Sequence, residues 1–300
     1  MEKTVVIVNP IAGNGKSMEL WPEVRAYLSS LGLDFEERLT QRQGHAIELA
    51  REAVEAGARA VVAVGGDGTL HEVVNGVGVN SQVAIGLIPT GSGNDFLRSL
   101  GLQPGDWQQA CRVIAAGCTA LIDLGEVNGR KFINVAGAGL DAAVVDCANT
   151  WGKRVFGNKL GYIAALLRTL VQFQPAEATL HLDDQVVESK IWLIAVANGR
   201  FFGGGMRIAP DAAYDDGLFD ICVVGRCSKL SFLTAFPRIY NGSHLTHPAV
   251  SMYRAARVEV KTARPVPIQT DGEVVATTPE KFRMYTGVLR VFVNQETRGA

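Results

Sequence analysis

The sequence predicts an α/β protein with two domains, a parallel-sheet domain over residues 1–124 and a mainly-β sandwich over residues 125–300. Two observations lead to this prediction. Short apolar strands alternate with helical patterns along the first part of the chain, which is typical of a parallel sheet covered on both faces. Further along, short strand-like runs follow one another between turns, which is typical of a sandwich. The pattern leaves open that the last residues pack back on the first domain.

The first domain is expected to be Rossmann-like. The run TVVIVN is short and β-branched, which favours a strand. The next segment has apolar residues at helical spacing (Leu20, Val24, Tyr27, Leu28 and Leu31). The same alternation continues, and it predicts strands at Thr4–Asn9, Phe35–Leu39, Val61–Val64 and Ala84–Ile88, with helices at Met18–Leu31, Ala46–Ala56 and Leu70–Val77.

The second domain begins with a hairpin signal. The segment Glu126–Asn134 places Asn-Gly between two strand-like runs, which indicates a type I′ turn. Helical patterns interrupt the later strands at Leu160–Phe173 and Ser228–Tyr240. Further strands are predicted at Thr179–Leu182, Ile191–Ala197, Phe219–Val224, Arg257–Lys261, Val266–Thr270 and Val288–Val293.

The composition excludes several classes of protein. A net charge of -1 argues against a nucleic-acid-binding protein, which usually has a basic excess. Five cysteines without a CxxC pair indicate reduced thiols, and the N-terminus MEKTVVIVNP has no secretory pattern. No apolar run approaches the ~18 residues of a membrane span. We therefore expect a cytoplasmic protein, still able to touch a membrane surface.

Three glycine-rich turns follow strands of the first domain: Asn9–Ser17, Gly65–Thr69 and Pro89–Asp95. The carboxyl ends of parallel strands share one edge of the sheet, where ligands bind. Backbone N–H groups without Cβ atoms, helix N-termini and the cation of Lys16 together favour a nucleotide phosphate. The spacing matches neither a Walker A loop nor the Rossmann fingerprint, and the GxGxxA match at Gly137–Ala142 is interpreted as chance.

Some of these residues also have ordinary structural explanations. Thr69 and Glu72 match a capping box, which can coexist with a phosphate contact. The acidic segment Pro210–Asp220 and the Asp271-Gly272 pair could each be a solvated hairpin turn.

Four motifs together carry a family resemblance. GGDGTLHEVVNG and IPTGSGNDFLRSLG in the first domain, with ANGRFFGGGMRIAPDAAYDDGLFD and TDGE in the second, resemble the bacterial diacylglycerol-kinase-like lipid kinases. The resemblance covers nearly the whole chain, although GGDG alone also occurs in NAD kinases and in sphingosine and ceramide kinases. It implies an ATP site between the two domains, with contacts from Asn9, Pro10, Gly13, Lys16, Thr40, Gly65, Gly66, Asp67, Gly68, Thr69, Leu70, Thr90, Ser92, Asn94 and Asp95.

The resemblance also assigns roles to acidic residues. Asp67 would lie near the Mg²⁺–phosphate group, so that either the metal offsets its charge or its carboxylate orients the loop amides. Asp216 would bind a structural Mg²⁺ together with the carbonyls of Ala213 and Leu218. We assign the general base to Glu273 and the orientation of metal or water to Asp271, with the reverse assignment close behind.

The sequence thus predicts an ATP- and Mg²⁺-dependent lipid kinase that phosphorylates a hydroxyl of a glycerol-based lipid such as diacylglycerol. Two alternatives stay open: an NAD kinase-like phosphotransferase and a non-enzymatic nucleotide-binding regulator. The lipid substrate requires transient contact with the inner membrane surface. We expect that contact from the basic, aromatic segment Trp151–Lys159 and the apolar helix after it. A homodimer is expected from the resemblance alone.

Overall fold

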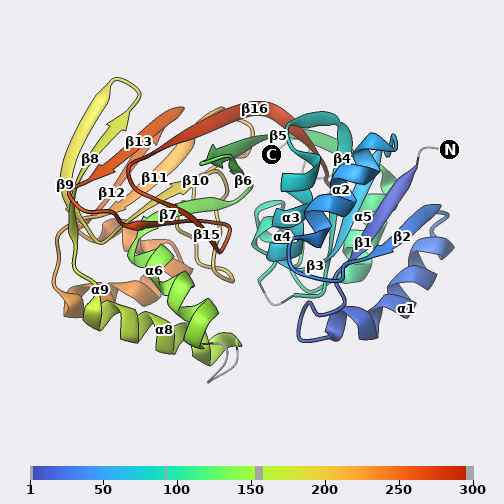
Figure 1. Ribbon diagram of the computed structural model, residues 1–300, viewed down its shortest axis with the longest axis horizontal. Coiled ribbons are helices and arrows are strands. Elements are labelled where there is room, and N and C mark those ends of the chain that lie inside the picture. Colours follow the sequence, from blue (N-terminus) through green and yellow to red (C-terminus); the bar gives the residue numbers. More distant parts are fainter. Residues whose placement is uncertain (1–2, 92, 153–157, 295–300) are drawn as a thin grey trace.

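The computed structural model describes residues 3–91, 93–152 and 158–294, with backbone only at 81, 151, 152 and 158–163. The fold class is confirmed: an α/β domain with a parallel sheet lies beside a β-sandwich (Figure 1). No helix in these ranges combines the length and apolarity needed to cross a bilayer.

The first domain alternates strands and helices as predicted. Strands β2, β1, β3 and β4 pair in that order, all parallel. Successive residues of a strand face opposite sides, so Val5 and Ile7 pack under α2 and α3 while Val6 and Val8 pack against α1 and α5. The elements are β1 (Thr4–Val8), α1 (Lys16–Ser30), β2 (Phe35–Leu39), α2 (His45–Glu55), β3 (Ala60–Gly65), α3 (Asp67–Val77), β4 (Asn80–Pro89), α4 (Asp95–Ser99) and α5 (Trp107–Ala116).

The second domain is mostly antiparallel strands, with helices along one side of the sandwich (Figure 1). Its elements are β5 (Thr119–Val127), β6 (Arg130–Phe132), β7 (Val135–Gly139), α6 (Leu140–Cys147), η1 (Ala148–Gly152), α8 (Asn158–Gln172), β8 (Ala176–Leu182), β9 (Gln185–Ile191), β10 (Leu193–Ala197), β11 (Phe219–Val224), α9 (Lys229–Ala235), η2 (Phe236–Tyr240), η3 (Ser243–Thr246), β12 (Val250–Ala255), β13 (Arg257–Thr262), β14 (Pro267–Thr270), β15 (Glu273–Thr277) and β16 (Glu280–Phe292).

The sandwich consists of two sheets around an apolar core. One sheet has the order β12-β11-β10-β7-β14-β15. The opposite layer is the far end of the parallel sheet, which continues through β16 to β13, β8 and β9. Residues such as Leu180, Ile194 and Phe282 fill the space between the layers. The outer face of the six-stranded sheet packs under α6, α8 and α9 through Val144, Leu166 and Phe232.

Strand β16 joins the two domains. Its first residues pair with β13 and its last with β4, while β5 pairs along its other edge. The strand bends near Gly287, whose φ of 60° suits glycine. Asp123 fixes the bend, because its two carboxylate oxygens accept the N–H groups of Gly287 and Gly217, both at 2.7 Å. The predicted domain boundary at residue 124 lies inside β5. Both β5 and β16 therefore run from one domain into the other.

Candidate active site

The three glycine-rich turns meet at the carboxyl edge of the parallel sheet, and their glycines allow them to touch. A Cβ atom on Gly91 would lie 2.7 Å from the Cα of Gly66, and one on Gly13 would lie 2.3 Å from the carbonyl oxygen of Thr90. The Thr90 N–H donates to the Gly65 carbonyl at 2.8 Å. Side chains larger than hydrogen would force these turns apart.

The predicted nucleotide residues lie at this edge. Asn9 Nδ2 donates to Thr69 Oγ1 at 3.0 Å. The Thr40 N–H donates a hydrogen bond to the carbonyl oxygen of Val8, the last residue of β1. Leu70 is fully buried in the core, so only its backbone can face a ligand. Ser92 lies outside the described residues. Asp67, Asn94 and Asp95 are described below. The remaining predicted nucleotide residues lie in the glycine-rich turns or in the first turn of a helix: Pro10, Gly13, Lys16, Gly65, Gly66, Gly68 and Thr90.

Asp67, the first residue of α3, ties two of these turns together. Its Oδ2 accepts the N–H of Asn94 at 2.6 Å and its Oδ1 accepts that of Asp95 at 2.8 Å. The contacts correspond to the second of the two roles considered above, in which the carboxylate orients loop amides. Burial and the nearby Asp95 raise the pKa of Asp67 to about 7. The negative charge gathered here favours a cation in the site.

The predicted capping box is wrong. Helix α3 begins at Asp67, which places Thr69 inside its first turn. The carboxylate of Glu72 instead accepts the N–H groups of Gly44 at 2.9 Å and Ala46 at 3.1 Å, and so caps the neighbouring helix α2. A capping box assumes that the helix starts at the threonine, but here Asp67 and Gly68 already belong to the helix and the extended Gly66 precedes it.

Asn94 and Asp95 connect the first domain to the second. Asn94 is left-handed (φ 53°), and its Nδ2 donates to the carbonyls of Gly91 at 3.0 Å and Pro104 at 2.6 Å. Asp95 is only 3% exposed, and its Oδ2 accepts the N–H of Gly204 from the GGG turn of the sandwich at 2.7 Å. Burial raises the pKa of Asp95. The pair therefore fixes one wall of the site.

Asp271 is held rigidly between the domains. Its Oδ1 accepts the N–H groups of Asn134 and Val135, both at 3.1 Å, and its Oδ2 accepts that of Ile133 at 2.8 Å. The same Oδ2 lies 3.3 Å from His71 Nδ1, and the side chain is 2% exposed. A carboxylate with its oxygens already engaged is better suited to positioning than to accepting a substrate proton.

Glu273 is placed differently. Its side chain is 31% exposed, and its Oε2 lies 3.8 Å from Nε2 of the buried His71. His71 thus lies between the two carboxylates, at the start of α3. Our sequence-based prediction missed this residue, although it stands four positions after Asp67 and so on the same face of the helix. Of the two carboxylates beside His71, only that of Glu273 is substantially exposed.

Several of the residues described above, although neither His71 nor Glu273, line a cavity of ≈ 200 Å³ between the domains. Asp67 and Asp95 line it from the first domain, and Asp271 lines it from the second. Gly203 and Gly204 of the GGG turn complete one side. The cavity therefore combines the glycine-rich turns of the first domain with an excess of carboxylates.

Asp141 also lines this cavity and was missed as well. Its Oδ2 accepts a hydrogen bond from Nε2 of Gln269 at 3.3 Å, while its Oδ1 has no hydrogen-bond partner among the described residues. It lies at the junction of β7 and α6, within the Gly137–Ala142 match that the sequence led us to dismiss. The match marks a strand-to-helix turn, but one in an antiparallel sheet and without a dinucleotide-binding unit.

Asp141 should make stability depend on pH. Burial raises its pKa to about 6, so the folded state holds this proton more tightly than the unfolded state does. Its contribution to stability is complete below the unfolded pKa of ~4 and is lost as the pH rises to about 6. Between these values we expect the unfolding free energy of the parent to fall by up to about 3 kcal/mol relative to Asp141→Asn.

The measurement is chemical denaturation across this pH range. Asp184→Asn, in an exposed hairpin turn, controls for the loss of one carboxyl group. Parallel pH curves for the parent and Asp141→Asn would contradict the expectation.

The predicted Mg²⁺ site at Asp216, Ala213 and Leu218 stays a prediction. Asp216 Oδ1 accepts the N–H of Leu218 at 3.0 Å, and its other oxygen contacts the guanidinium of Arg254. Within the described ranges, no group of three or more acidic, histidine or cysteine side chains could hold a metal ion. A cation at Asp216 would therefore have to displace Arg254 and depend on carbonyl oxygens and water.

The fold and the cleft define a class of protein in which a glycine-rich α/β domain faces a β-sandwich. Known families match both halves: the diacylglycerol kinase catalytic domain matches residues 3–127, and the YegS C-terminal NAD kinase beta sandwich-like domain matches residues 134–293. The chain belongs to the diacylglycerol kinase family, which confirms the resemblance seen in its motifs.

Individual relatives agree over nearly the full length. A diacylglycerol kinase of Mycobacterium tuberculosis is 31% identical over 295 residues, covering 96% of this chain and 94% of the relative. That of Bacillus subtilis (strain 168) is 29% identical over 283 residues, covering 94% and 93%. A solved structure from Bacillus anthracis, assigned to the diacylglycerol kinases, superposes with a TM-score of 0.82 at 27% identity, covering 99% of this chain and 96% of that one.

Proposed function

We propose that the protein is an ATP- and Mg²⁺-dependent lipid kinase, which transfers the γ-phosphoryl group to a hydroxyl of a glycerol-based lipid such as diacylglycerol. The observation that carries the proposal is the cavity between the domains, in which Asp271 of the sandwich lies across from Asp67 and Asp95 of the glycine-rich turns. Glu273 follows two residues after Asp271 and lies 3.8 Å from His71. The names of the relatives support it, since several are called diacylglycerol kinase.

Each part of the cleft has a role in this reaction. The N–H groups of the three turns and Lys16 bind the phosphates. Glu273 accepts the proton of the lipid hydroxyl, and Asp271 with His71 fixes the segment that carries it. The two domains position the reactants and stabilise the charge of the transferred phosphoryl group. They form no covalent intermediate with it, as is usual for phosphoryl transfer.

The donor set suits a nucleotide-bound Mg²⁺. Carboxylates are hard oxygen ligands, and Asp67, Asp95 and Asp271 are three of the four that line the cavity, beside Asp141. Their mutual repulsion contributes to the raised pKa of Asp67, so a cation would relieve an electrostatic cost already present. When bound with the nucleotide, Mg²⁺ would neutralise phosphate charge, and these residues would hold it through water.

The assay that tests the proposal measures ATP consumption with three acceptors: diacylglycerol in mixed micelles, NAD, and no acceptor. We expect Mg²⁺-dependent consumption with diacylglycerol only. Consumption with NAD would support the NAD kinase-like alternative. Nucleotide binding without consumption would support a regulator.

We further propose that the sandwich contacts the membrane through an apolar ridge on α8 and α9, formed by Leu167, Val171, Leu230 and Leu233. These side chains are 45%, 73%, 71% and 38% exposed. The two helices are adjacent, because Lys229 Nζ donates to the Val171 carbonyl at 2.5 Å. Exposed apolar side chains beside cations suit a bilayer surface. Most of the segment Trp151–Lys159 predicted for this role lies outside the described residues, and no side chain in it is described.

If this ridge contacts the membrane, charged substitutions in it should weaken membrane binding. Val171→Asp with Leu230→Asp adds two negative charges and removes two apolar contacts, so co-sedimentation with anionic vesicles should fall at least about tenfold. Val186→Asp, at an exposed valine of β9, is the control and should bind like the parent. Equal binding by the double variant would place the contact elsewhere.

A further inference from the structure

Gln269 is a buried polar residue in the wall of the cavity between the domains. It is only 2% exposed, and it stands in β14 next to Ile268 of the sandwich core. Because neighbouring residues of a strand face opposite sides of a sheet, Gln269 points away from that core and toward α6. A buried amide is costly unless its polar atoms are satisfied, so its partners show what it holds in place.

The amide of Gln269 connects two segments of the site. Its Oε1 accepts the N–H of Gly272 at 2.8 Å, and its Nε2 donates to Oδ2 of Asp141 at 3.3 Å. The Gly272 N–H can only donate, which fixes the orientation of the amide and directs Nε2 toward the carboxylate. Gln269 therefore joins the start of helix α6 to the turn between β14 and β15.

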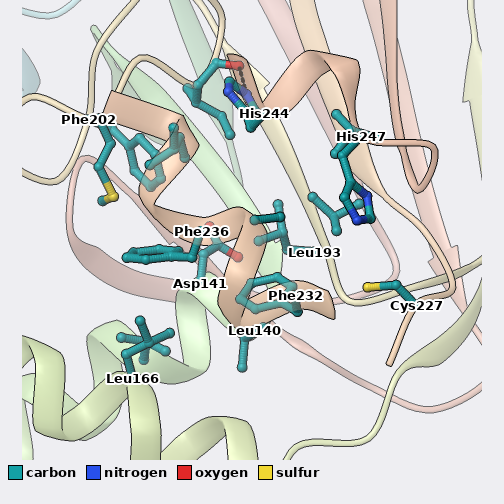
Figure 2. A pocket seen from close by; sticks show the side chains of 17 residues that line it. Leu140, Asp141, Leu166, Leu193, Phe202, Cys227, Phe232, Phe236, His244 and His247 are labelled. Atoms are coloured by element: carbon teal, nitrogen blue, oxygen red, sulfur yellow. Dashed lines mark hydrogen bonds between the residues drawn. The ribbon is translucent and has the colours of Figure 1, made fainter. Parts of the chain in front are cut away.

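The glycine at position 137 makes room for this arrangement. Gly137 pairs with Gln269 between β7 and β14, and a Cβ atom on it would lie 1.6 Å from Oδ2 of Asp141 and 3.1 Å from Nε2 of Gln269. On another side, Asp141 borders an apolar cavity inside the sandwich domain, among side chains such as Leu140 and Phe236 (Figure 2). These apolar side chains offer the carboxylate no hydrogen bond, so the amide of Gln269 and the carboxylate are matched to each other.

The turn that Gln269 holds carries Asp271 and Glu273. Asp271 and Gly272 both have positive φ, at 45° and 92°, as in a tight hairpin turn. A left-handed conformation is unfavourable for a residue with a side chain, and it persists only where its surroundings fix it. The backbone N–H and the carboxylate of Asp271 bind the segment 133–135, whereas the Gly272 N–H binds Gln269. Gln269 thus fixes the side of the turn that leads to Glu273.

A bulge in β15 follows directly after this side of the turn. Gln269 pairs with Val274 but Ile268 pairs with Ala276, so β15 has one more residue than β14 over this stretch. Bulges redirect side chains and are common beside active sites. Regular pairing therefore extends only a short way from the turn, and the position of Glu273 depends on the side-chain contact at Gly272.

We propose that Gln269 is a positioning residue for the phosphoryl transfer: by linking the Gly272 N–H to Asp141 of α6, it sets the place at which Glu273 meets the acceptor hydroxyl. This rests on the proposed function, which gives Glu273 the role of the base. Gln269 takes up no proton and acts only through the turn. Its loss should therefore lower kcat and leave KM for ATP unchanged, since the nucleotide is assigned to the glycine-rich turns of the other domain.

The first test compares two buried contacts at opposite ends of β14. Gln269→Met keeps the length of the side chain but can neither accept the Gly272 N–H nor donate to Asp141. Thr278→Val is the matched control, because the buried Thr278 Oγ1 accepts the Val266 N–H at 3.1 Å, and its loss also leaves a backbone N–H of this hairpin without its acceptor. We expect kcat to fall roughly tenfold to a hundredfold in Gln269→Met, the cost of a misplaced catalytic group, and to stay parental in Thr278→Val.

Thermal unfolding shows whether each variant is folded, and Gln269→Leu replaces Gln269→Met if the latter unfolds early. Parental kcat in a folded Gln269 variant, or an equal loss of kcat in Thr278→Val, would overturn the positioning role.

A double variant shows whether Gln269 acts through Glu273. If it does, Gln269→Met should lower the rate of phosphoryl transfer no further in a Glu273→Gln protein, as measured by single-turnover kinetics. Effects that multiply would overturn the proposal, because Gln269 would then act independently of the base.

Hydrogen exchange tests the same contact without turnover. The Gly272 amide should exchange roughly fivefold to tenfold faster in Gln269→Met than in the parent, and at the parental rate in Thr278→Val. Unchanged exchange in Gln269→Met would overturn the proposal whatever the kinase assay gives. Faster exchange in a protein that phosphorylates no lipid would support the hold of Gln269 on the turn while the proposed function fails.

Discussion

Replacing Glu273 by Gln is expected to lower kcat by roughly 10²–10⁴-fold, the usual contribution of a general base. Gln keeps the size of the side chain but cannot accept the proton of the lipid hydroxyl. Glu273 is the more exposed of the two carboxylates beside His71, while Asp271 is occupied by backbone N–H groups. We therefore expect ATP binding to be retained and phosphoryl transfer to be lost.

The measurement is steady-state kinase activity with dioctanoylglycerol, alongside nucleotide binding by calorimetry. Glu188→Gln, at an exposed position of β9, removes the same charge far from the cleft and should behave like the parent. Near-normal kcat in Glu273→Gln would move the base role to Asp271. In that case Asp271→Asn should lose turnover without losing stability, although its carboxylate accepts several N–H groups.

The second large effect is expected at Asp67. Asp67→Ala removes the acceptor of the Asn94 and Asp95 N–H groups, so the two turns lose their common anchor. It also removes one of three carboxylates that would attract a nucleotide-bound cation. We expect kcat/KM for ATP to fall by more than about a hundredfold, since misplaced phosphates lose both position and charge stabilisation.

Asp106→Ala is the matched control for Asp67→Ala. Asp106 caps α5 by accepting the Gln109 N–H at 2.8 Å, at some distance in the chain from the glycine-rich turns. Its loss should cost about 1 kcal/mol of stability and leave KM for ATP unchanged. Circular dichroism and thermal unfolding of both variants separate loss of fold from loss of site. An Asp67→Ala protein with parental kcat/KM would remove Asp67 from the nucleotide site.

The sequence allowed most of the first domain to be predicted because its central strands β1 and β3 are buried throughout and form continuous apolar runs, with helical patterns between the strands. Phe35–Leu39 was predicted with the observed bounds, and the Asn128-Gly129 hairpin is confirmed by positive φ at both residues. Strands β9, β12 and β15 were missed, since half-exposed antiparallel strands such as Gln185–Ile191 have many polar residues. β7 was missed because Val135–Gly139 is mostly Gly and Ala, which disfavour strands.

The candidate site was only partly predictable. Glycine-rich turns are visible as local patterns, and their common edge follows from parallel topology. Contacts across domains have no local signal: nothing near Asp95 indicates that Gly204 will meet it, and nothing near His71 indicates Asp271 and Glu273. The apolar cavity inside the sandwich domain is likewise a product of packing, because its walls come from residues scattered between Leu140 and Val250.

Strand β16 has a consequence for how the chain folds during synthesis. Leu289 and Val291 of this strand, with Val293 just after it, are buried in the core of the first domain, yet they are synthesised only after the other strands of the sandwich. Until then β4 remains an unpaired edge, a hazard for aggregation in a nascent chain. The first domain should therefore be unable to complete its folding before the sandwich strands have been synthesised, and the pairing of β16 should close both cores together.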